Sequence, residues 1–203
     1  DTALYREGFT NLMRWGLFPV VLVFLALCMR TLKGARSWGH PATVGFLISA
    51  GLAVLGFVLG AMIRGSNTMV PAHYHASIGA VTAAFMTVTF VLLAPLGLPL
   101  RDGVLKRAAR WQPVVFGVGQ MVFAAGFGLA GMYGMARKTY GAEQAIRSTE
   151  EWVGLVVMGV GGLVAVAGGI LFLTIVATAW RRRLTDSLQG RTEWSTQNPK
   201  TSP

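Results

Sequence analysis

The sequence predicts an all-α integral membrane protein. Only 13% of its 203 residues are charged and 53% are apolar, against roughly 25% and 45–50% in ordinary soluble domains. The apolar residues form long blocks, rather than the stripes of helices that pack on a soluble core. Each block reaches the length of about 20 residues that a helix needs to cross about 30 Å of hydrocarbon. A five-span membrane domain is therefore expected over residues 1–180.

The predicted spans, in chain order, are Leu12–Leu32, Thr43–Ile63, Ala72–Leu96, Trp111–Met135 and Trp152–Trp180. The first is the weakest, because it contains Arg14. The second is joined to the third by a short turn over Arg64–Pro71. The fourth and fifth each begin at a tryptophan, whose amphipathic ring suits the headgroup level of the bilayer.

The fifth span is rich in glycine, which lets helix backbones approach closely in a membrane. Close helix contacts, within this chain or with another, are expected at Gly154, Gly159, Gly161, Gly162, Gly168 and Gly169. Residues 181–203 follow this span; they are polar and end in proline. We expect them to form a flexible cytoplasmic tail.

Basic residues predict the orientation of the spans. They cluster between spans one and two, between spans three and four, and after span five. These regions alternate along the chain, so they share one side of the membrane, and the positive-inside rule makes that side cytoplasmic. The N-terminus is then outside and the C-terminus is cytoplasmic. The net charge of +10 reflects this topology and some attraction to anionic lipid. No basic patch interleaved with stacking aromatics indicates nucleic-acid binding.

His73 and His75, near the start of the third span, are candidate cofactor ligands. Each residue of an α-helix advances by about 100°, so the two imidazoles point to opposite sides of the helix. They cannot share one ion, because the ligands of a single metal on a helix lie about one turn apart. The spacing instead suits a helix lodged between two cofactors. The alternative is two buried histidines that form hydrogen bonds across helices.

The segment Asn67–Thr82, which contains His73-Tyr74-His75, resembles the tenth transmembrane helix of subunit I of the heme-copper oxygen reductases. In that helix a His-aromatic-His triplet ligates two hemes. Asp1–Tyr5 resembles the outer start of the family's eighth helix, the second span its ninth, and Gly128–Tyr140 the end of its eleventh. The resemblance implies that the chain forms helices eight to twelve of a twelve-helix subunit. It is closest to the divergent, non-mitochondrial-type branch.

The resemblance also implies roles for five residues. His73 matches the axial ligand of the high-spin heme at the oxygen-reducing site, and His75 matches one axial ligand of the low-spin heme. Tyr74 is at the family's aromatic position between the hemes; alternatively, it is an ordinary lipid- or helix-facing ring. Arg137 and Lys138 match the basic pair that binds heme propionates, where the family more often has two arginines. Their alternative role is that of an interfacial pair whose charges reach the headgroups.

Other parts of the family pattern are missing from this chain. The copper ligands, the second ligand of the low-spin heme and the acidic proton-channel residues belong to the family's first seven helices. Gly65 and Ser66 stand where the mitochondrial-type branch has a magnesium-binding pair. The resemblance thus implies a second membrane polypeptide that supplies seven helices and the copper site. The predicted N-terminus is outside and the number of spans is odd. We therefore expect that further chain precedes Asp1, or that a partner chain supplies the missing part.

The implied function is that of a heme-ligating subunit of a respiratory terminal oxidase, inactive alone. It would carry electrons from the low-spin to the high-spin heme, where dioxygen is reduced, coupled to proton translocation. Cytochrome c or quinol would be the electron donor, and the location would be a bacterial or archaeal cytoplasmic (inner) membrane. The alternatives are a non-catalytic or single-heme subunit or assembly factor that retains the fold, or a component of a nitric oxide reductase.

Overall fold

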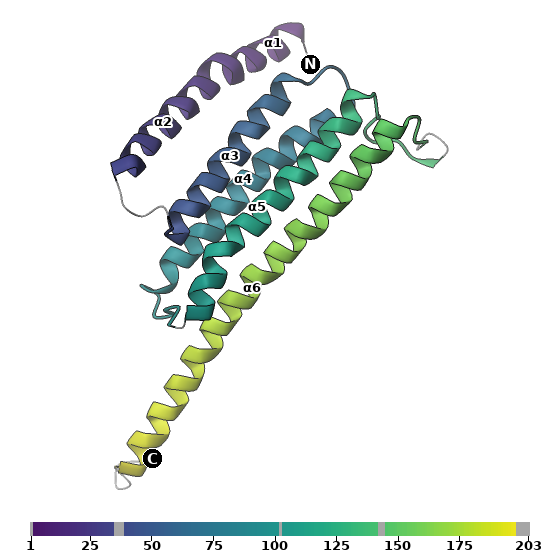
Figure 1. The fold of residues 1–203 in the computed structure, drawn as a ribbon. Coiled ribbons are helices and arrows are strands. Elements are labelled where there is room, and N and C mark those ends of the chain that lie inside the picture. Colours follow the sequence, from purple (N-terminus) through teal and green to yellow (C-terminus); the bar gives the residue numbers. More distant parts are fainter. Residues whose placement is uncertain (1, 35–38, 102, 142–144, 198–203) are drawn as a thin grey trace.

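The structure is a computed structural model that describes residues 2–34, 39–101, 103–141 and 145–197. Within these ranges the regular elements are helices, and five of them are long and apolar enough to cross a membrane. The prediction of an all-α protein with five candidate spans is confirmed. Figure 1 shows the helices running alternately up and down, so that the N-terminus and the described end of the chain lie at opposite ends.

The first helical stretch is continuous and consists of α1 (Ala3–Asn11), a π-helical segment η1 (Leu12–Leu17) and α2 (Phe18–Gly34). The remaining helices are α3 (Pro41–Ala61), α4 (Met69–Leu93), α5 (Gly103–Met132) and α6 (Thr149–Gln197). Each helical stretch begins before its predicted span, whereas α3, α4 and α5 end two or three residues earlier than the predicted ends at Ile63, Leu96 and Met135. Hydropathy marks the length of chain in hydrocarbon, whereas helical hydrogen bonding continues into the polar flanks.

Local sequence explains where α3 and α6 begin. Before α3, the Nδ1 atom of His40 accepts a hydrogen bond from the Ala42 amide at 3.2 Å, and Pro41 occupies the first turn, where its missing N–H costs nothing. Before α6, the Ser148 hydroxyl accepts from the Glu151 amide at 3.2 Å, and the Glu151 carboxylate accepts from the Arg147 amide at 2.7 Å. This arrangement differs from a standard capping box only in that Glu151 binds the amide of Arg147, one residue before the N-cap Ser148.

Helices α5 and α6 pack through glycines placed at seven-residue intervals. These are Gly119 and Gly126 on α5, and Gly154, Gly161 and Gly168 on α6. A Cβ atom on Gly154 would lie 2.7 Å from the Ala130 amide nitrogen, and one on Gly161 would lie 2.8 Å from the Gly119 carbonyl oxygen. The two backbones are therefore in direct contact along this row of glycines.

The six glycines expected at helix contacts do not behave alike. Gly154, Gly161 and Gly168 touch the backbone of α5, and a Cβ on Gly162 would meet the ring of Phe123. Gly159 and Gly169 face open space. Contacts within this chain are thus confirmed at four positions, because these residues lie on the side of α6 turned toward α5; at Gly159 and Gly169 a contact with another chain stays a prediction.

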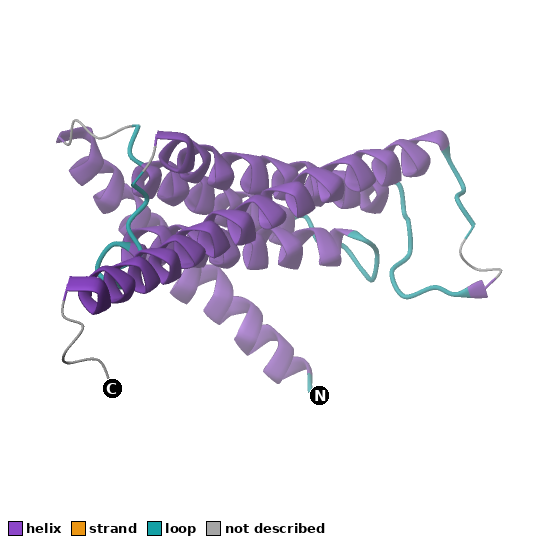
Figure 2. Cartoon of the chain, turned by 90° about the horizontal axis from the view of Figure 1, so that it is seen from below, coloured by secondary structure: helices purple, strands orange, loops and turns teal. Residues whose placement is uncertain are grey.

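The first helical stretch is separate from the other helices. Its most apolar window has no buried residue, and the ring contact that it makes with the bundle joins Phe18 and Phe57, with centroids 5.1 Å apart. Figure 2 shows this stretch crossing the bundle at an angle. Its large apolar side chains are exposed, so lipid or further protein must cover them.

Residues 181–197 are helical, unlike the flexible tail expected over residues 181–203, because α6 continues through Gln197. No glycine or proline follows Trp180 until Gly190, and most of the intervening residues are good helix formers. Arg101 and Asp186 form an exposed ion pair of 2.9 Å, and Arg183 donates to the Leu96 carbonyl at 2.8 Å. These contacts join the continuation of α6 to the loop between α4 and α5. Residues 198–203 of the expected tail lie outside the described residues.

We predict that Gly161→Ala lowers the free energy of unfolding by about 1–3 kcal/mol, the cost of overpacking a close contact. Gly159→Ala is the matched control, because its Cβ enters open space; it should be neutral or stabilise by up to about 1 kcal/mol through helix propensity. Thermal unfolding in detergent, followed by circular dichroism, measures both. Equal effects of the two substitutions would contradict the glycine interface.

Candidate functional site

His73 and His75 leave α4 toward two different helices. The Nδ1 atom of His73 lies 2.7 Å from the carbonyl oxygen of Gly56 on α3. The ring of His75 packs edge-on against Phe123 of α5, with centroids 5.0 Å apart, and stacks on Phe127 at 5.9 Å. Because α4 has both α3 and α5 as neighbours (Figure 1), the predicted opposite orientation is confirmed.

The contact with Gly56 fixes the tautomer of His73. A carbonyl oxygen can only accept a hydrogen bond, so Nδ1 must carry the proton and donate it. The Nε2 atom then keeps a free lone pair. Histidines that bind metals commonly use this arrangement, in which a backbone carbonyl holds the ring and the other nitrogen is the ligand. His73 also lines a cavity of about 450 Å³ between the first helical stretch and α3, together with Met13, Phe18 and Phe57.

Two glycines on α3, one turn apart, make room for this face of α4. A Cβ on Gly60 would lie 2.8 Å from Nδ1 of His73, and one on Gly56 would lie 2.5 Å from the Ser77 hydroxyl. Any larger residue at Gly60 must displace the imidazole or separate the helices. The position of His73 therefore depends on Gly60, which has no side chain to contact the imidazole.

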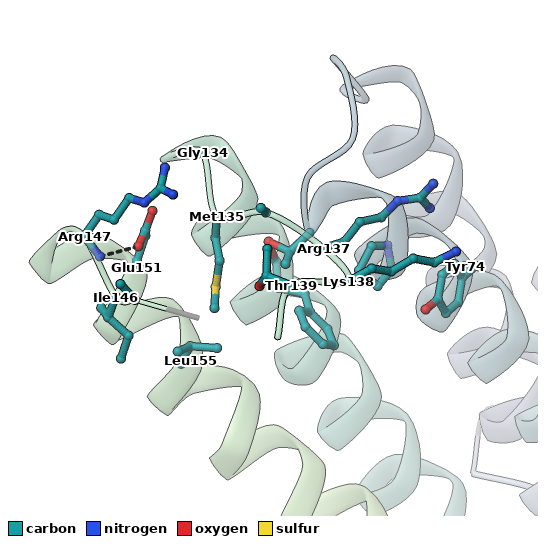
Figure 3. A pocket seen from close by; sticks show the side chains of 15 residues that line it. Tyr74, Gly134, Met135, Arg137, Lys138, Thr139, Ile146, Arg147, Glu151 and Leu155 are labelled. Atoms are coloured by element: carbon teal, nitrogen blue, oxygen red, sulfur yellow. Dashed lines mark hydrogen bonds between the residues drawn. The ribbon is translucent and has the colours of Figure 1, made fainter. Parts of the chain in front are cut away.

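Tyr74, Arg137 and Lys138 line a second cavity, of about 630 Å³, at the same end of the bundle. Figure 3 shows the two basic side chains on the same side of this cavity as Tyr74. His75 does not line it, but stacks on Phe127, which does. Three of the five predicted site residues therefore line this cavity. His75 is separated from it by the ring of Phe127, and His73 lines the cavity beside the first helical stretch.

The loop that carries Arg137 and Lys138 is tied to the turn before α4. The Thr68 amide donates to the Met135 carbonyl at 2.9 Å, and the Asn67 side-chain amide donates to the Gly131 carbonyl at 3.0 Å. Arg137 Nε donates to the Ser66 hydroxyl at 3.1 Å. Lys138 has a φ of 57°, a left-handed conformation that is uncommon for a residue other than glycine. The loop that carries the basic pair is therefore held by one main-chain bond and by the side chains of Asn67 and Ser66.

Sequence reasoning missed several residues of this region. Asn67 and Ser66 were not recognised as the residues that hold the loop, because their partners are far away in the chain. Glu151 lines the second cavity and is only 2% exposed; its place in the capping arrangement at the start of α6 explains its burial. Among the described residues, no group of three or more histidine, cysteine, aspartate or glutamate side chains could hold a metal ion by itself.

The sequence analysis did not identify two glutamines whose side-chain oxygens are buried, Gln112 and Gln120. Gln112 is fully buried, and its amide nitrogen donates to the Gly168 carbonyl at 3.1 Å. Its Oε1 atom, and that of Gln120, have no hydrogen-bond partner within the described part of the chain. Both glutamines could have been identified from the sequence, because each is a polar residue within an otherwise apolar span.

Comparison with known proteins finds no matching family model and no matching solved structure. The chain is 27% identical to an uncharacterized protein of Rickettsia prowazekii (strain Madrid E) over 157 residues. This aligned segment is 71% of this chain and 29% of that protein. It is 32% identical over 102 residues to an uncharacterized protein of Aquifex aeolicus (strain VF5), 48% of this chain and 25% of that protein. The chain thus spans less than a third of the length of either relative.

We predict that Asn67→Ala destabilises the protein by about 1–3 kcal/mol, because it leaves the Gly131 carbonyl and the Met69 amide without their partner. Asn11→Ala is the control, since Asn11 is exposed and makes no capping bond. Amide hydrogen exchange at Thr68 should become faster in the first variant only. Unchanged exchange at Thr68 in Asn67→Ala would show that the loop is held by other contacts.

Proposed function

We propose that this chain is a heme-ligating part of a membrane-bound respiratory terminal oxidase, in which His73 ligates a high-spin heme and His75 a low-spin heme. The observation that carries the proposal is the divergence of the two imidazoles from α4 toward α3 and α5. One helix can serve two cofactors only if its ligands point in different directions. The resemblance of Asn67–Thr82 to the family's tenth helix supports the same assignment.

The surroundings of His73 fit a heme ligand. Its Nδ1 proton is committed to the Gly56 carbonyl, so Nε2 is the nitrogen that would coordinate iron. Phe9, Phe18 and Phe57 give the adjoining cavity an aromatic wall, as suits an apolar macrocycle. The bound hemes would supply the electron transfer and the iron that reacts with dioxygen, and the protein would orient and tune them.

Arg137 and Lys138 would bind heme propionates from the second cavity. Two carboxylates near the low-dielectric edge of a membrane need charge-assisted partners. The main-chain bonds of Thr68 and the side chain of Asn67 hold this loop against the start of α4. Tyr74 is 42% exposed and lies against His75, with ring centroids 4.7 Å apart, so its ring is free to contact a cofactor or a partner.

A further polypeptide segment must complete the proposed site. Low-spin ligation by two imidazoles needs a histidine on the other face of that heme, but the one other histidine of the sequence, His40, begins α3 at the opposite end of the bundle. The outer face of α4, along Tyr74, Ile78 and Phe85, is exposed. We propose that about seven further helices cover it and bring the copper ligands. The greater length of both relatives is compatible with such helices in one polypeptide.

The proposed location is a bacterial or archaeal cytoplasmic (inner) membrane, with cytochrome c or quinol as the electron donor. The basic residues at the end of α2, between α4 and α5, and after Trp180 share one end of the bundle, opposite the start of α4, which carries His73 and His75 (Figure 1). By the positive-inside rule that end is cytoplasmic. The N-terminus and the hemes would then lie toward the outer surface, and the C-terminus would be cytoplasmic.

One observation favours a second candidate, a subunit or assembly factor that binds a single heme. The ring of His75 is already in contact with Phe123 and Phe127 of its own chain, which is an ordinary way to pack a histidine between helices. His73, by contrast, faces a cavity. In this alternative only His73 would ligate iron.

We predict that His73→Ala removes the carbon-monoxide-reactive high-spin heme signal, whereas His75→Ala removes the low-spin signal. Each variant should lose mainly one heme, because the two rings face different neighbours. His40→Ala is the control and should keep both signals. Optical spectra of the purified complex measure all three variants. If the heme signals persist in both site variants, the ligand assignment is wrong; if only His73→Ala loses a heme signal and His75→Ala loses none, the single-heme candidate is favoured.

We predict that Arg137→Leu and Lys138→Leu lower a heme midpoint potential, because removing a positive charge disfavours the reduced, electron-rich state. A unit charge about 10 Å away at an effective dielectric of about 20 contributes on the order of 1–2 kcal/mol, which corresponds to tens of millivolts. Arg64→Leu is the control, since Arg64 caps α3 at the same end without lining the cavity. Redox titration that shows unchanged potentials in both site variants would make the pair an interfacial anchor.

A further inference from the structure

A third cavity, of about 850 Å³, lies at the end of the bundle away from His73 and His75. It opens where α3 begins, α4 ends and α5 begins. Lys106, Arg107 and Arg110 of α5 line it together with Trp111, and no aspartate or glutamate is among the described residues that line it. The cavity is thus strongly basic and plays no part in the proposed heme chemistry.

These three cations have no partner in the described part of the chain. The one ion pair there joins Arg101 to Asp186, and no hydrogen bond involves the side chains of Lys106, Arg107 or Arg110. Residues three and four apart on a helix are neighbours, and like charges at this spacing repel each other by about 0.2–0.5 kcal/mol per pair. An anion bound between them would remove this repulsion.

The start of α3 adds to the positive potential. The guanidinium of Arg110 lies against Gly39, where a Cβ would be 3.0 Å from Nη2, so it is held beside the N-terminus of α3. That end of the helix carries a partial positive charge. Because Nδ1 of His40 accepts from the Ala42 amide, its Nε2 carries the proton and is available as a donor. His40 also lines the cavity.

The wall of the cavity is apolar below this basic rim. Phe90, Leu93 and Ala109 line it and belong to one buried hydrophobic cluster. Trp111, 56% exposed, stands at the rim, where an indole ring suits the headgroup level. A soluble anion would use the cations and leave the apolar wall empty, whereas a phospholipid matches both parts. Basic pockets between membrane helices are known to bind anionic headgroups.

We propose that this cavity binds one anionic phospholipid. Its phosphate contacts Lys106, Arg107 and Arg110, and its glycerol and upper acyl chains lie on Phe90 and Leu93. The ligand is a lipid that carries a net negative charge, such as phosphatidylglycerol, and not a zwitterionic one. The site is independent of heme binding.

Native mass spectrometry of the full chain in detergent, titrated with phosphatidylglycerol or phosphatidylcholine, tests this proposal. Phosphatidylglycerol should bind as one tight equivalent, and phosphatidylcholine at least tenfold more weakly. The double variant R107Q/R110Q should lose tenfold or more in affinity for phosphatidylglycerol. The matched control R30Q/K33Q removes the same charge from the end of α2, outside the cavity, and should change the affinity less than twofold.

Three results would overturn the proposal. An equal loss of affinity for phosphatidylglycerol in both double variants would mean diffuse electrostatic attraction of the lipid to basic residues. Equal affinity for the two lipids would mean that the site does not distinguish the headgroup charge. Displacement of phosphatidylglycerol by millimolar inorganic phosphate, with phosphate alone raising the melting temperature, would identify a site for a free anion. If R107Q/R110Q does not fold, the single variant K106Q, with an expected loss of about threefold, replaces it.

Discussion

Direct contact between helix backbones at glycine is the constraint on which the rest of the structure depends. Membrane helices gain no hydrophobic energy by leaving lipid for one another, so close packing must hold them together. On one side of the bundle, Gly154 and Gly161 bring the backbone of α6 against that of α5. On the other side, Gly56 and Gly60 leave room for the Ser77 and His73 side chains, which lets α3 lie close to α4. Four helices are joined in this way, while the first helical stretch, which contributes no buried residue, stands apart.

The same packing determines the direction of each functional side chain. Because α4 is held by α3 and by α5, its residues have two covered faces and one open face. His73 falls on the first covered face, His75 on the second, and Tyr74 on the open one. The loop after α5 returns to the start of α4 through Asn67 and Thr68, which adds a pair of cations near the tyrosine. Two imidazoles that face different helices, and a separate pair of cations, therefore follow from the helix packing together with the loop after α5.

Much of this could be predicted from the sequence, for identifiable reasons. The five spans are set by block length and hydropathy, and the divergence of His73 and His75 is set by 100° per residue. The continuation of α6 to Gln197 was not predicted, because polarity reports where the membrane ends and not where a helix ends. The open surroundings of Gly159 and the bond from Asn67 to Gly131 were missed as well. Both depend on which residues meet across helices, which no local pattern records.

The central claim is that α4 presents two imidazoles to two different hemes. Difference spectra of the purified membrane complex that contains the unmutated chain, reduced minus oxidised and then reduced with and without carbon monoxide, test it most directly. If α4 serves two hemes, the spectra should show two heme populations in equal amount. The absorption of one should change with carbon monoxide, and that of the other should not. A complex that contains no heme would contradict this claim, and so would one whose hemes all respond to carbon monoxide in the same way.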